Sequence, residues 1–163
     1  MLRIYPETPD DTPEVEYLFD LAFAPGRQAL SSYRLRDGVP PVAELCLVAR
    51  GEEGALAGAI RYWPVLIGAA QALLLGPVAV HPTRQGEGVG RLLIRESLER
   101  AEALGWTRVL LVGDAPYYKR FGFEQLRGLK LPPPTNPERI LGKELIAGAF
   151  DNISGDVSAL KLD

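Results

Sequence analysis

The segment Pro77–Arg91, PVAVHPTRQGEGVGR, constrains the fold more than any other part of the chain. A run of β-branched residues stops at a His-Pro pair, and three glycines at alternate positions between 86 and 90 then lead into a helical pattern. Glycine inside a regular element costs roughly 1 kcal/mol relative to alanine. The cluster therefore indicates that the backbone itself has a task here, at a strand that turns sharply into a helix.

Such a turn directs several backbone N–H groups, together with the positive end of the helix dipole, at one point in space, which suits a pyrophosphate. A P-loop is excluded, because that pattern needs Lys and then Ser or Thr after its last glycine and this chain continues with GRLL. The dinucleotide-binding pattern is weak, because its third glycine is not at the required place. The alternative is that the glycines serve only a tight turn and close helix packing.

Composition limits the partners. The 163 residues, 47% of them hydrophobic, suit one domain over residues 1–163. A net charge of −3, with 18 basic and 21 acidic residues spread along the chain, gives no basic face for nucleic acid. The opening MLRIYPETPDD lacks the basic and apolar regions of a signal peptide, and no apolar run is long enough for a membrane span, so we expect a soluble, cytoplasmic protein.

The single cysteine, Cys46, lies in an apolar run and predicts a buried, inert thiol. No metal site is expected.

Hydrophobic periodicity predicts elements in the order βααβββαβαβ, which form a mixed α/β (α+β) sheet in one layer with helices on its faces. The predicted strands are LRIYPE, ELCLVAR, ALAGAIRYWPVLIG, QALLLGPVAV, RVLLV and, last, RILGKELI. The predicted helices cover 10–26, 27–38, 88–104 and the short APYYKRF.

Capping and proline signals refine this outline. Thr12 is the expected N-cap of the first helix and Gly26 its stop. Pro64 and Pro77 remove backbone donors, so each should lie at a bulge or an edge of the sheet.

Two separated motifs resemble one family. Gln85–Gly90 resembles the Q/R-x-x-G-x-G/A signature of the GNAT superfamily of acetyl-CoA-dependent N-acetyltransferases, and YYKRFGF resembles its later Y-x-x-x-G-F element. The similarity covers Val42 to Phe123 well, and the amino-acid sequence of other stretches is most similar to the bacterial YhbS-like branch of this superfamily. The resemblance implies the GNAT fold, with a mostly antiparallel sheet that is splayed at the acetyl-CoA site and helices on both faces.

The resemblance also implies where acetyl-CoA binds. A strand backbone pairs with the pantetheine arm and the glycine loop cradles the pyrophosphate, while Pro77 fits a bulge that opens the slot. Arg84 and Arg91 flank the anion, with solvated surface arginine as the alternative for each. The residues assigned to the cofactor are Val78, Ala79, Val80, Arg84, Gln85, Gly86, Glu87, Gly88, Val89, Gly90 and Arg91.

The implied reaction moves an acetyl group to a primary amine by direct attack. Tyr118 occupies the family's tyrosine position, and a phenol with a pKa near 10 can protonate the departing thiolate; packing under the cofactor is the alternative. Tyr117 fits the apolar position before it, and a backbone N–H near Val78 is the expected oxyanion donor.

The general base has the weakest signal. The strand RVLLVGD offers no carboxylate before Asp114. The candidate base is therefore Glu44, at the start of ELCLVAR, which would activate the amine through a water molecule. The alternative is that Glu44 is simply a solvated residue at the end of a strand. His81 is either a proton-transfer group or a turn residue.

Several alternatives stay open. The second function class is a catalytically silent acyl-CoA-binding sensor; a nucleotide-dependent kinase or nicotinamide oxidoreductase is disfavoured by glycine spacing and chain length. The acceptor could be an aminoglycoside, a polyamine, an amino acid or a protein N-terminus, and a homodimer stays open.

Overall fold

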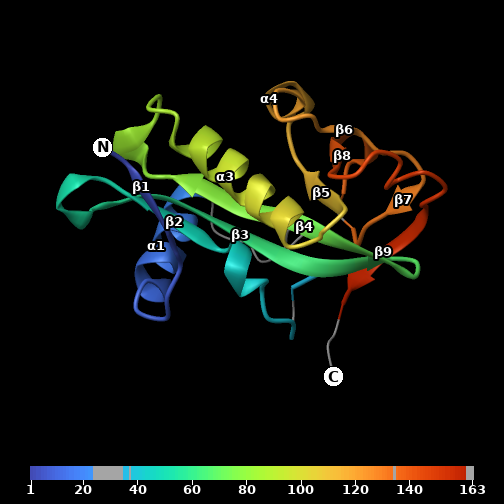
Figure 1. Cartoon of the computed structure of the whole chain (residues 1–163), viewed down its shortest axis with the longest axis horizontal. Helices are drawn as coiled ribbons and strands as arrows, with labels where there is room; N and C mark the ends of the chain where they lie inside the picture. The colour runs from blue at the N-terminus through green and yellow to red at the C-terminus, as the bar shows by residue number, and fades with distance from the viewer. Residues whose placement is uncertain (24–34, 37, 134, 161–163) are drawn as a thin grey trace.

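One mixed sheet organises the chain in the computed structural model, which describes residues 1–23, 35–36, 38–133 and 135–160 (Figure 1). The strands are β1 Arg3–Pro6, β2 Leu47–Arg50, β3 Leu56–Ile67, β4 Ala70–Val80, β5 Arg108–Val112, β6 Glu124–Gln125, β7 Leu129–Lys130, β8 Ile140–Glu144 and β9 Gly155–Ala159. They lie in the order β1-β2-β3-β4-β5-β8-β6, with β9 beside β3 and β7 beside β9. The β4–β5 and β7–β9 pairs are parallel and the other pairs antiparallel, which confirms a mixed, mostly antiparallel sheet.

Helices cover both faces of this sheet. The α helices are α1 Thr12–Ala22, α3 Val89–Ala103 and α4 Ala115–Lys119, and the short 3₁₀ helices are Ala43–Leu45, Glu52–Gly54, Pro82–Arg84 and Pro137–Arg139. Leu47 packs in the same buried cluster as Leu93 of α3, and the next residue, Val48, packs with Phe19 of α1. Because successive strand residues point to opposite faces, α1 and α3 lie on opposite sides, as predicted. No helix within the described ranges is both long and apolar enough to cross a membrane.

The start of α1 differs from the prediction in its cap. The N-cap is Asp11 and not Thr12. The Asp11 carboxylate accepts the Thr8 N–H at 2.8 Å and the Arg50 guanidinium at 2.7 Å, so it closes the preceding turn and ties it to β2. These contacts hold the pKa of Asp11 below its ordinary value, the Thr8 N–H having the largest effect.

Two other predictions concern where the first helix ends and which strand comes last. α1 ends at Ala22, earlier than the predicted stop at Gly26, which lies outside the described residues together with most of the predicted helix over 27–38. RILGKELI forms β8 but is not the last strand, since β9 follows and pairs with β3 through Ile67 and Val157. The sequence of β9, GDVSA, is short and only one of its residues is buried, so it carries little strand pattern.

Pro64 lies at a local edge, as predicted. β3 pairs with β2 as far as Ile60 and with β9 from Val65 onward, so Pro64 falls between these two partners on that side. On that side the Pro64 carbonyl oxygen accepts the Leu160 N–H at 3.3 Å, so the missing proline N–H falls at the end of the β3–β9 pairing.

Cys46 is buried, as predicted, with 4% of its surface exposed. Its thiol lies 3.4 Å from the Val42 carbonyl oxygen, and burial raises its pKa to about 11. A thiol held protonated in this way is a poor nucleophile at neutral pH.

Candidate active site

The central feature of the site is the free edge of β4. β4 pairs with β5 only at Leu73 with Val109 and Leu74 with Leu110. Beyond Leu74, the described part of the chain supplies no strand partner on this side of β4. The sheet is therefore splayed between β4 and β5, as the family resemblance implied.

A β-bulge marks the point where the two strands separate. In the β3–β4 ladder Tyr62 is opposite Leu75 and Ile60 is opposite Val78, so Gly76 and Pro77 together face a single residue of β3. A bulge bends its strand and increases the local twist. This confirms the predicted bulge at Pro77 and gives a physical cause for the splay.

The free edge presents defined backbone groups. The His81 N–H donates to the Ala57 carbonyl oxygen of β3 at 2.8 Å, and consecutive strand residues direct their polar groups to opposite sides. Ala79 therefore faces β3, while Val78 and Val80 direct their N–H and C=O groups toward the gap. The Gln85 side-chain amide donates to the Val80 carbonyl oxygen at 3.2 Å, in agreement with this direction.

The glycine loop follows directly, and its glycines have different roles. Gly86 and Gly88 have φ of +84° and +79°, and a Cβ added to either would meet nothing within 4 Å. Glycine is favoured there by its left-handed backbone and not by lack of space. At Gly90 a Cβ would lie 3.4 Å from the Tyr117 hydroxyl oxygen, so Gly90 instead allows close packing against α4.

Gly88 is the N-cap of α3, so the first N–H groups of this helix point back to the loop. The opening N–H groups of any α helix lack intrahelical partners and carry the positive end of the dipole. Together with the left-handed glycines they make this loop suited to an anion, next to the free edge of β4.

The other loop side chains support the loop. His81 Nδ1 accepts the Thr83 N–H at 3.2 Å, which makes His81 a turn-capping residue. Arg84 forms an ion pair with Glu87 at 2.9 Å and covers Gly51, where an added Cβ would lie 2.6 Å from the guanidinium. Arg84 is therefore held by protein groups on the β2–β3 side of the loop.

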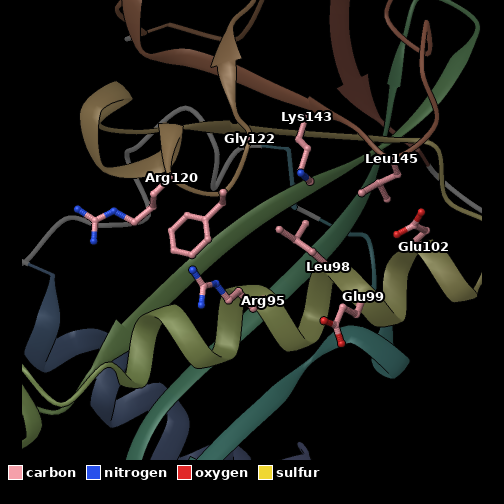
Figure 2. Close-up of a pocket in the computed structure, with 9 residues that line it drawn as sticks. Arg95, Leu98, Glu99, Glu102, Arg120, Gly122, Lys143 and Leu145 are labelled. Carbon is pink, nitrogen blue, oxygen red and sulfur yellow. The ribbon is translucent and has the colours of Figure 1, made fainter.

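A basic groove runs between α3 and α4. Its lining includes four cations, Arg91, Arg95, Lys119 and Arg120. Arg95 and Arg120 also line the neighbouring cavity, of about 480 Å³, in which Figure 2 shows the side chain of Lys143 pointing from β8 toward Leu98 of α3. Sequence reasoning selected Arg91 alone. The four-residue spacing of Arg91 and Arg95 could have shown that both lie on one side of α3.

Tyr118 lies in a separate cavity of about 280 Å³ at the splay. Its described lining residues are Phe23, Arg36, Leu75, Gly76, Pro77, Val78, Leu111, Val112, Gly113, Asp114, Tyr118 and Arg139. Tyr118 and Val78, a predicted acid and a predicted oxyanion donor, thus face the same space. Burial raises the pKa of Tyr118 to about 12, so the phenol stays protonated at neutral pH.

The position of the Tyr118 ring depends on its neighbours. It contacts Tyr117 and Phe123 edge-on, with ring centroids 5.0 and 5.8 Å apart. A Cβ at Gly113 would lie 2.7 Å from Tyr118 Cε2, so only glycine leaves room for the ring. Tyr118 is therefore fixed by packing at the end of β5.

The prediction that Glu44 lies at the start of a strand is wrong. It is exposed on the 3₁₀ helix Ala43–Leu45, before β2, because the Leu45 N–H donates to the Val42 carbonyl oxygen at 2.9 Å and closes a turn there. Glu44 is not among the described residues that line the Tyr118 cavity. The carboxylate that lines it is Asp114, whose Oδ2 accepts the Tyr117 N–H at 3.2 Å and so caps α4. The role of Glu44 as base stays a prediction.

No group of three or more His, Cys, Asp or Glu side chains suited to a metal ion is found within the described ranges. The polar groups at the site are backbone N–H groups, the Tyr118 phenol, the Asp114 carboxylate and cationic side chains. This combination fits binding of a phosphate-bearing ligand and acyl transfer.

Comparison with known proteins defines the class as an acetyltransferase. The family model described as "Acetyltransferase (GNAT) domain" matches residues 43–125, which include the free β4 edge, the glycine loop and Tyr118. The chain belongs to the GNAT family of N-acetyltransferases.

Individual relatives agree with this assignment. The chain is 33% identical over 121 residues to the uncharacterized N-acetyltransferase YhbS of Escherichia coli, a match that covers 72% of this chain and 71% of that protein. The crystal structure of E. coli YhbS in complex with CoA superimposes with a TM-score of 0.81 at 28% identity, covering 98% of this chain and 89% of that one. A GNAT acetyltransferase from Brucella melitensis, in complex with acetyl-CoA, gives a TM-score of 0.64 at 34% identity, covering 93% and 99%.

Proposed function

We propose that this protein transfers an acetyl group from acetyl-CoA to a primary amine, with Tyr118 as the proton donor to the leaving thiolate. The observation that carries the proposal is the free edge of β4, which meets the N-terminus of α3 at one end and the Tyr118 cavity at the other. The solved relatives that carry CoA or acetyl-CoA support the identity of the donor.

The protein groups suit the three parts of the donor. The N–H groups of Gly86 to Arg91 receive the pyrophosphate, and the outward-facing Val78 C=O and Val80 N–H pair with the pantetheine amides. The groove cations Arg91, Arg95, Lys119 and Arg120 lie beside the pyrophosphate position and suit the further phosphate of the nucleotide. Arg84 and Glu87 then shape the loop through their ion pair and need not touch the anion.

Acetyl-CoA supplies an activated thioester. The acceptor nitrogen forms a bond to the carbonyl carbon, and the Val78 N–H stabilises the oxyanion that develops. The carbon–sulfur bond breaks, the sulfur takes the phenolic proton of Tyr118, and the phenolate recovers a proton from solvent. Before the attack the acceptor ammonium loses one proton to water, a step in which Glu44 stays the predicted relay, and the nitrogen loses a second proton to water as the tetrahedral intermediate collapses.

The second function, a catalytically silent acyl-CoA sensor, has less support. A sensor needs the β4 edge and the loop but not a phenol in the adjoining cavity. Tyr118 lies there in its protonated form, and its ring is packed against Gly113, which favours catalysis.

The test is acetyl transfer from acetyl-CoA to a panel of amines, detected as released CoA thiol, with wild type and two matched variants. Tyr118→Phe removes one oxygen and keeps the ring, and should lower kcat by roughly 10²- to 10⁴-fold at unchanged CoA affinity. The control is Tyr117→Phe, because Tyr117 packs against Phe121 and does not line the Tyr118 cavity.

Two results would contradict the proposal. CoA binding without acetyl transfer to any amine would favour the sensor. A loss in kcat below about threefold for Tyr118→Phe, repeated under single-turnover conditions to exclude slow product release, would remove Tyr118 from the mechanism.

A further inference from the structure

The charged groups of the Tyr118 cavity constrain the acceptor. Its described lining holds two guanidinium groups, Arg36 and Arg139, and one carboxylate, Asp114. Val78 and Tyr118 are already assigned to the thioester, so the remaining charged groups are those that an acceptor meets. A cavity of about 280 Å³ also limits the acceptor to a small molecule or the end of a chain.

Arg139 is held in place at the cavity wall. Its Nε donates to the Gly113 carbonyl oxygen at 3.3 Å, and the Gly113 N–H donates back to the Arg139 carbonyl oxygen at 2.9 Å. Within the described ranges no carboxylate lies within ion-pair distance of Arg139, so its terminal nitrogens have no anionic partner there. Arg139 and Tyr118 line the same cavity.

Arg36 adds a second cation with a fixed plane. Only 9% of its surface is exposed, and its guanidinium lies over the Trp63 ring, 5.3 Å from the ring centroid. A stacked guanidinium presents its N–H groups in the plane of the stack. Arg36 and Arg139 thus both bring a cationic group to the described lining of this cavity, while the carboxylate of that lining, Asp114, accepts the Tyr117 N–H at the cap of α4.

Building on the proposed acetyl transfer, we infer that the acceptor is a small amine that also carries a carboxylate, as an amino acid does, and that Arg139 binds this carboxylate. A planar guanidinium matches the two oxygens of a carboxylate. Asp114 is the group of opposite sign for the ammonium before it loses its proton. A polyamine or aminoglycoside would place further positive charge beside Arg36 and Arg139, and is disfavoured.

The test compares acceptors that differ only in the carboxylate. The probes are L-amino acids and their α-carboxamides, with spermidine and kanamycin as polycationic amines, and the measurement is kcat/KM for CoA release at saturating acetyl-CoA. Wild type, Arg139→Gln and Arg139→Lys are compared with Arg3→Gln, a control on the exposed strand β1. Comparing each acid with its amide in every variant cancels the difference in amine basicity between them.

Wild type should prefer the acid over its amide by about tenfold or more, and Arg139→Gln should reduce this preference to below about threefold. The loss should appear in KM for the acid, with kcat/KM for the amide almost unchanged. Arg139→Lys should keep part of the preference, and Arg3→Gln all of it. Unchanged melting temperatures would exclude a general structural effect.

Three results would overturn the inference. Equal or better transfer to spermidine or kanamycin would reject the carboxylate-bearing acceptor and leave the proposed acetyl transfer intact. An equal loss of kcat for acid and amide in Arg139→Gln would mean that Arg139 acts through Tyr118 and not on the acceptor. Acetyl-CoA binding without transfer to any probe would reject the proposed function, and this inference with it.

Discussion

The two edges of β4 differ sharply. Toward β3 it is paired almost from end to end, from Ile67 with Ala70 to Gly58 with Val80. Toward β5 it is paired at Leu73 and Leu74, and beyond Leu74 no strand within the described residues pairs with it on this side. One strand thus has a side whose hydrogen bonds hold the sheet and a side whose unpaired polar groups suit the ligand proposed above. The comparison teaches that stability and chemistry can be perturbed separately here.

Two glycines offer a matched way to test this separation. Gly58 lies on β3, and Gly113 follows β5; neither has room for a Cβ. The same substitution, glycine to alanine, should therefore damage folding at one position and catalysis at the other.

Among the substitutions that test the two edges, Gly113→Ala should have the largest effect. Its Cβ would lie 2.7 Å from Tyr118 Cε2 and 2.8 Å from Leu111 Cδ1, so the phenol must move. A displacement of about 1 Å can cost about 10²-fold in rate, and we expect kcat to fall by roughly 10- to 100-fold. CoA affinity, measured by calorimetry, should change little. An unchanged kcat would show that the position of Tyr118 is not critical.

Gly58→Ala should act on stability. Its Cβ would lie 2.7 Å from Val89 Cγ1 of α3 and 2.9 Å from the Ala79 carbonyl oxygen, and a backbone oxygen in a paired strand cannot easily move. We expect a loss of about 1–3 kcal/mol in the free energy of unfolding, measured by urea denaturation. At low temperature and saturating acetyl-CoA, kcat should stay close to wild type. A loss of kcat without a loss of stability would show that Gly58 serves catalysis and not the stability of the sheet.

A smaller effect is expected at the glycine loop. Gly88→Glu places a carboxylate at the N-terminus of α3 and should weaken CoA binding at least about tenfold, equivalent to roughly 1.4 kcal/mol. Gly88→Asn is the matched control, because asparagine tolerates a φ near +79° and adds no charge. Calorimetry should show a much smaller loss for Asn than for Glu. Unchanged affinity in a folded Gly88→Glu variant would contradict the anion site.

The smallest effect concerns Cys46, beside the start of β2. Because burial raises its pKa from 9.0 to about 11, the thiol should stay protonated in the native state up to about pH 9, and react slowly with thiol reagents. Denaturation should make labelling rapid and stoichiometric. Rapid labelling of the native protein at neutral pH would contradict the burial of this side chain.

The parts of the candidate site that could be predicted from the sequence are those defined by the spacing of a few neighbouring residues. The glycine loop and Tyr118 each belong to a short motif whose geometry is complete within a few residues. Pro77 could be assigned to a bulge because proline lacks the N–H that a ladder requires. These features need only a strand, a turn and a helix in the right order.

The parts that were missed depend on distant pairing. Arg139 reaches Gly113 and Tyr118 only because β8 pairs with β5, with Ile140 opposite Val112. No spacing along the chain carries that information. Glu44 shows the converse, since a single acidic residue at the start of an apolar run does not reveal whether the chain is extended or turned there.

The free edge of β4 also bears on self-association. An unpaired strand edge is a template for adding another polypeptide, which is a common route to aggregation. Here the bulge at Gly76 and Pro77 interrupts the edge, and the Gln85 side chain occupies the Val80 carbonyl oxygen beyond it. Only a short regular stretch stays free, enough for the amides of a slender ligand but not for a full strand. The bulge that opens the site would thus also limit pairing of this edge with a second copy of the chain.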